Sequence, residues 1–184
     1  MRVRILLLMT LLLINACTPK PDVDAIYNSL KEGEARLLVN MDGEAFYPED
    51  SRFNGEVTIS TNTIHINLFD QHESNVILSF ADQTLFAKKP VVRTIMVDNQ
   101  SAGSVMIGRV RDKKLRTGDG FLMTEGDVTV ESLSEEKMVI RLLGKTGNFN
   151  TMRDPKTWKS LEGLLVYKRP KIMLRGDAPK SLLY

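Results

Sequence analysis

The sequence predicts a mainly β fold, an antiparallel β-sandwich or barrel with one short N-terminal helix. Two observations predict it. Many short segments alternate apolar and polar residues, and turn residues separate nearly all of them. A helical spacing of apolar residues, by contrast, occurs once, between residues 22 and 33. A chain of 184 residues with one cysteine must draw its stability from a hydrophobic core, because it cannot form an internal disulfide.

The predicted helix follows a short Pro-rich stretch. Asp22 is suited to accept hydrogen bonds from the first turn, and Gly33 is suited to end the segment. The apolar residues at helical spacing are Val23, Ile26, Tyr27 and Leu30. We expect this face to cover a sheet.

The period changes to two at Ala35. Leu37, Val39 and Met41 alternate with other residues and lead into Asp42-Gly43, a pair typical of a type I′ hairpin turn. The chain is then expected to return as a strand over residues 44–47.

Further strands are predicted along the rest of the chain. They cover residues 57–60, 63–69, 76–80, 91–97, 104–110, 120–124, 128–132, 137–143, 164–167 and 171–174. The segment from Gly147 to Lys159 is the longest predicted to be irregular.

The N-terminus has the features of an export signal. Arg2 and Arg4 precede an apolar run from Ile5 to Ile14. A helix needs roughly 20 apolar residues to cross a bilayer, and this run has about half that number. It therefore predicts a cleaved signal peptide and not a membrane span.

The end of this run resembles the lipobox of bacterial lipoproteins. The matching residues are Ile14, Ala16 and Cys17. The resemblance implies that diacylglycerol is attached to the Cys17 thiol and that the chain is cut before this residue. It implies a signal peptide over 1–16, a lipidated tether over 17–21 and a single β-rich domain over 22–184.

The location follows from the same resemblance. Thr18, which is not acidic, stands after the cysteine, and in enterobacterial lipoproteins this favours the outer membrane. The β-rich remainder is similar in style to small lipoproteins of Bacteroidota, a likeness that implies no defined activity. Periplasmic and surface-exposed placements both stay open.

The charge is unevenly distributed along the chain. Arg2 and Arg4 are two of the 25 basic residues, so the mature part balances 23 bases against 23 acids. Residues 17–82 hold 12 acids and 4 bases, and residues 83–184 hold 11 acids and 19 bases. Strands of a sandwich or barrel interleave, so we expect the halves to neutralise each other. The interspersed charges and the lack of a binding motif predict no nucleic-acid partner.

Residues suited to catalysis or metal binding are few. His65 alternates with Ile64 and Ile66 and is expected to face solvent. His72 lies in the polar segment 70–73, which lacks metal-ligand spacing and is interpreted as a solvated turn. Ser104 is in an apolar strand and not in a nucleophile elbow. Residues 117–120 are Gly-rich but lack the lysine of a phosphate loop, so they are interpreted as a turn.

Several other groups are interpreted as structural. The carboxylate pairs Glu49-Asp50 and Glu135-Glu136 are expected in loops, and Trp158 with Tyr167 is expected in the core and not in a sugar platform. Segment 175–177 reads Arg-Gly-Asp and is interpreted as a turn. The basic residues from Lys168 to Lys180 are expected to be a solvated strand edge.

These observations favour a non-enzymatic binding protein or accessory subunit of a cell-envelope assembly, held at the membrane by its lipid, with a protein partner and no cofactor or metal. Two alternatives stay open. A carrier of a small apolar ligand requires an enclosed cavity of several hundred cubic ångströms in a barrel. A hydrolase requires carboxylates or a histidine that converge in a cleft.

Overall fold

The computed structural model describes residues 21–97 and 103–184. The predicted signal peptide, Cys17 and most of the predicted tether lie outside the described residues. The helices and strands are α1 Val23–Ser29, β1 Ala35–Met41, β2 Glu44–Ala45, β3 Phe53–Ile59, β4 Thr63–Asp70, β5 Asn75–Ala81, β6 Val91–Met96, β7 Gly103–Asp112, β8 Thr117–Leu133, β9 Lys137–Asn148, β10 Lys159–Lys168 and β11 Lys171–Leu174, with short 3-10 turns at Pro155–Thr157 and Lys180–Leu182.

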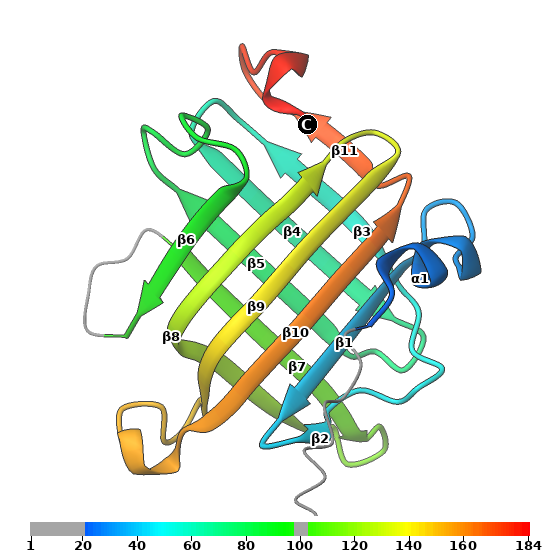
Figure 1. The fold of residues 1–184 in the computed structure, drawn as a ribbon. Helices are drawn as coiled ribbons and strands as arrows, with labels where there is room; N and C mark the ends of the chain where they lie inside the picture. The colour runs from blue at the N-terminus through cyan, green and yellow to red at the C-terminus, as the bar shows by residue number, and fades with distance from the viewer. Residues whose placement is uncertain (1–20, 98–102) are drawn as a thin grey trace, which may run out of the picture.

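Eight of the strands close into an antiparallel barrel (Figure 1). Their order is β3-β4-β5-β7-β8-β9-β10-β1, and the pairing of Ala35 in β1 with Phe53 in β3 completes the ring. The predicted mainly β class and short helix are thus confirmed. Of the two predicted architectures, sandwich and barrel, the structure adopts the barrel. The strands outside the ring are short: β2 pairs with β1, β6 with β8, and β11 runs parallel to β3.

The barrel interior is filled by apolar side chains. Alternate residues of each strand point inward, and the buried apolar residues of β4, Ile64, Ile66 and Leu68, have no exposed surface. Tyr167 of β10 also lies inside, where its hydroxyl donates to the Gly55 carbonyl at 2.8 Å. His65 is exposed between its buried neighbours, as predicted.

The first hairpin has the predicted turn and a shorter second strand than predicted. Asp42 and Gly43 have φ values of 52° and 83°, as a type I′ turn requires. The expected strand 44–47 ends at Ala45, because Phe46 and Tyr47 turn into the core. Three edge-to-face ring contacts hold this segment, including Tyr47 with Phe53 at 5.0 Å between ring centres.

Residues 117–133 form one long strand, which corrects two predictions. The segments 120–124 and 128–132 were expected to be separate strands, and 117–120 was expected to be a turn. The first part of β8 pairs with β7 and the second part with β6, while β9 pairs along its length. Asp119, within the expected turn, binds Arg109 at 2.9 Å and also Arg111. The Gly-rich stretch stays extended because residues 117–120 pair with β7, and these ion pairs join the same two strands.

Helix α1 lies outside the barrel, on β9 and β10 (Figure 1). Asp22 caps it, since its Oδ1 accepts from the Asp24 amide at 2.9 Å, as predicted. Its apolar face joins a small cluster separate from the barrel interior. The buried members of this cluster are Leu30, Val139, Leu164 and Val166, with Val23, Ile26 and Tyr27 packed against them.

Ion pairs join the acidic half of the sequence to its basic half. Six described pairs cross between the halves. They join Asp24 to Lys137, Glu32 to Arg169, Asp42 to Lys159, Glu56 to Lys171, Glu73 to Lys113 and Asp82 to Arg93. At these pairs the acidic and the basic half of the sequence therefore neutralise each other, as expected.

Candidate functional site

A groove runs along the outer face of β1, between α1 and the loop of residues 46–52. It consists of two adjoining pockets of about 500 Å³ and 330 Å³, which share Arg36, Leu38 and Glu49. The remaining residues that line the larger pocket are Ile26, Ser29, Asp50 and Arg52. The groove is open to solvent and combines apolar side chains with four charged ones.

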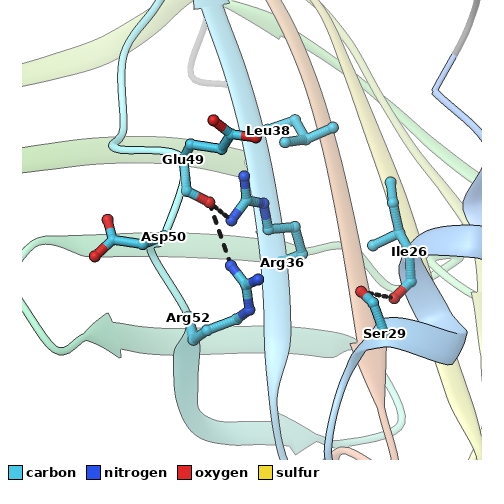
Figure 2. A pocket seen from close by; sticks show the side chains of 7 residues that line it. All are labelled: Ile26, Ser29, Arg36, Leu38, Glu49, Asp50 and Arg52. Atoms are coloured by element: carbon cyan, nitrogen blue, oxygen red, sulfur yellow. Dashed lines mark hydrogen bonds between the residues drawn. The ribbon is translucent and has the colours of Figure 1, made fainter.

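Two arginines meet in this groove. The Nη1 atoms of Arg36 and Arg52 both donate to the carbonyl oxygens of Glu49 and Ser51, as Figure 2 shows for Glu49. The distances to the Ser51 oxygen are 3.2 Å from Arg36 and 3.0 Å from Arg52. Each guanidinium carries five N–H donors, so both have donors left over for a further acceptor.

Neither arginine forms an ion pair with a carboxylate of residues 21–97 or 103–184, at a limit of 4.0 Å. Glu49 and Asp50 line the same pocket, but the Asp50 carboxylate points away from both guanidinium groups (Figure 2). Burial, and next the charge of Arg52, lower the pKa of Arg36, and the two carboxylates oppose this shift. An anion in the groove would favour the charged form of Arg36 in the same direction as Glu49 and Asp50 do.

The loop that carries these groups is held rigidly against the turn between β4 and β5. Asp70, which is buried, accepts from the Ser51 hydroxyl at 2.8 Å and from the Ser74 amide at 2.8 Å. Gln71 donates to the Asp50 carbonyl at 2.8 Å and accepts from the Arg52 amide at 2.9 Å. The two guanidinium groups are thus pre-positioned, so ordering them when a ligand binds would cost little conformational entropy.

Neither Arg36 nor Arg52 stands out in the sequence. Arg36 occupies an ordinary outward position of a strand, and Arg52 precedes the next strand by one residue. Their convergence depends on how the 46–52 loop folds back over β1, which no local pattern encodes. Glu49 and Asp50 do lie in a loop, as predicted.

The structure brings His72 to the rim of this region. Its Nε2 lies 3.2 Å from Oδ1 of Asp50, and both side chains are substantially exposed. The neighbouring hydroxyls are engaged elsewhere, since Ser29 donates to the Ile26 carbonyl at 2.7 Å and Ser51 to Asp70. Among the described residues, no group of three His, Cys, Asp or Glu side chains is arranged to hold a metal ion.

The remaining residues considered in the sequence lie apart from the groove. Trp158 is half-buried and donates to the Met152 carbonyl at 2.8 Å, whereas Tyr167 is inside the barrel, so the two rings form no platform. Residues 175–177 form a turn in which Gly176 has φ 58°. Ser104 is exposed in β7, and Glu135 and Glu136 pair with Lys180 and Arg169.

No protein-family model, curated protein or solved structure matches this chain. None of the helices in the described part of the chain is long and apolar enough to cross a membrane.

The barrel interior bears on the carrier alternative. Inward side chains from all eight strands of the ring form one cluster of buried residues. The larger described pocket shares no lining residue with this cluster, and the smaller one touches it only at Leu37, Val39 and Tyr47, beside β1. A ligand of several hundred cubic ångströms would have to displace packed side chains, whereas the groove is already open.

Proposed function

We propose that this protein is a non-enzymatic, lipid-anchored binding protein of the bacterial outer membrane, and that its groove beside β1 binds an anionic group of an envelope protein partner. The observation that carries the binding role is the Arg36–Arg52 pair. Two like charges share the same carbonyl oxygens with no carboxylate partner among the described residues. A carboxylate or phosphate has the planar or multi-oxygen geometry that such guanidinium groups bind best.

The anchor rests on the lipobox. Diacylglycerol supplies two acyl chains, and stable membrane association takes about two such signals. We expect mass spectrometry of the mature protein to find diacylglycerol on Cys17, and we expect Cys17→Ser to stay unlipidated. A mature N-terminus at another residue, or a bare Cys17 thiol, would contradict the anchor.

The binding role is tested by site-specific crosslinking in intact cells. A photo-reactive amino acid replaces Leu38 in the groove or, as the control, Leu143, which is 64% exposed on the β9 wall. We expect the Leu38 probe alone to capture a partner. Arg36→Gln and Arg52→Gln should abolish capture, because each removes a positive charge from the groove.

Two further variants separate charge from folding. Arg52→Lys keeps the charge and should retain most of the capture. Lys145→Gln removes a cation of β9 that does not line the groove, and it should change nothing. Equal capture from both probe positions, or capture that survives both glutamine variants, would contradict the proposal.

A further inference from the structure

The turn between β7 and β8 holds an apolar side chain out into solvent. Leu115 is 73% exposed, the highest value among the large apolar residues described. Oδ1 of Asp112 accepts from the amides of Lys114 and Leu115 at 2.8 and 2.9 Å, and Arg116 has φ 52°. The turn is therefore closed by its own backbone and by Asp112, and its conformation keeps Leu115 at the tip.

This tip carries positive charge that the fold does not neutralise. Arg111 is paired with Asp119, and Lys113 lies 3.0 Å from Glu73. Lys114 and Arg116 are exposed and have no ion pair with a carboxylate in the described ranges. Two free cations thus flank Leu115 directly.

The loop after β9 repeats this combination at the same end of the barrel (Figure 1). Phe149 is 45% exposed, and Arg153 and Lys156 are exposed without an ion pair to any described carboxylate. The nearby acid, Asp154, accepts from the Lys156 amide at 3.1 Å. We call Lys114, Leu115, Arg116, Phe149, Arg153 and Lys156 together the basic rim.

The geometry points to the basic rim as a contact surface for a bilayer rich in anionic lipid headgroups. Cations near such a surface each favour binding, by roughly fivefold in the partition coefficient. Leu115 and Phe149 would enter the boundary between headgroups and acyl chains, where apolar side chains flanked by cations are stable. A nucleic acid accounts for the cations but gives Leu115 nothing to bury against, since a leucine cannot stack on a base as an aromatic ring does.

The contact is made by folded residues and does not depend on lipid at Cys17. It also uses the end loops of the barrel and none of the groove residues. The proposed function and the basic rim can therefore fail separately.

The test measures how close position 115 comes to the bilayer. Leu115→Trp and, as the control, Leu143→Trp are made in the otherwise unaltered mature protein, and the signal of the native Trp158 is subtracted. Each protein is mixed with vesicles that contain brominated acyl chains, which quench nearby tryptophan. One set of vesicles is phosphatidylcholine alone, and the other includes phosphatidylglycerol.

We expect quenching of the tryptophan introduced at position 115 in the anionic vesicles only, and reversal by high salt. Lys114→Gln with Arg116→Gln should weaken this quenching, whereas Lys145→Gln should not. Equal quenching at positions 115 and 143, or equal quenching in both kinds of vesicle, would overturn the inference. Tighter binding to a DNA duplex than to anionic vesicles, with the DNA binding unchanged in Leu115→Ser, would also overturn it.

Discussion

Gly126 and Gly144 face each other across β8 and β9 so closely that neither position accepts a side chain. A Cβ on Gly126 would lie 2.2 Å from the Leu143 carbonyl oxygen, and one on Gly144 would lie 2.0 Å from that of Glu125. The pair adjoins a register shift in β8. Missing side chains and the shift together let the long strand bend around the barrel.

Gly126→Ala should therefore destabilise the barrel strongly. Gly126 has φ 124°, so alanine meets backbone strain as well as overlap with backbone atoms of β9. We expect the free energy of unfolding to fall by about 3 kcal/mol in urea titrations. Gly43→Ala is the matched control, because Gly43 also has a positive φ but nothing lies within 4 Å of the added Cβ. It should cost about 1 kcal/mol, and equal losses would show that close approach is unimportant.

The same pair shows what a sequence can and cannot predict. Alternation located nearly every strand, because inward and outward positions must differ in a sheet with one buried face. Glu125-Gly126-Asp127 has the composition of a turn, so β8 was predicted as two strands. Only the facing Gly144 shows that Gly126 serves a bend within one strand. The groove was hidden for a related reason: Arg36 and Arg52 share carbonyl oxygens only after the 46–52 loop docks.

Tyr184 joins β6 to β8 through its hydroxyl. It accepts from the Val91 amide at 2.9 Å and donates to the Val130 carbonyl at 2.7 Å. Tyr184→Phe leaves both backbone groups without this partner, so we expect a loss of about 1–3 kcal/mol in unfolding free energy. Hydrogen exchange at the Val91 amide should also accelerate. Tyr27→Phe is the control, since the Tyr27 hydroxyl lies 3.5 Å from its acceptor. Slow exchange of the Val91 amide in Tyr184→Phe would contradict the bridge.

The stability of the fold should depend on pH through Asp82, which lies in the turn that precedes β6. Hydrogen bonds from the side chain and amide of Thr84, and then from Arg93, lower the pKa of Asp82 to about 2. A carboxyl group whose pKa is lower in the folded state stabilises the fold above its unfolded pKa of about 3.9. This contribution is lost as the pH falls from about 4 towards 2. NMR titration of the Asp82 carboxyl should show the low pKa, and Asp82→Asn should flatten the acid side of the stability profile. A midpoint near 4 would contradict these contacts.

Leu30→Ala should release α1 and leave the barrel folded. Leu30 is buried against Val139, Leu164 and Val166, in a cluster separate from the barrel interior, so its loss removes the packing that holds α1 and none that closes the ring. We expect hydrogen exchange across Val23–Ser29 to accelerate while the thermal unfolding of the barrel shifts little.

Leu165→Ala is the matched control from the interior face of β10. There the cavity should cost about 2–5 kcal/mol and lower the melting temperature of the barrel itself. Because α1 forms one wall of the groove, Leu30→Ala should also reduce capture by the Leu38 probe. A single unfolding transition in which helix and barrel are lost together would instead make α1 an integral part of the fold.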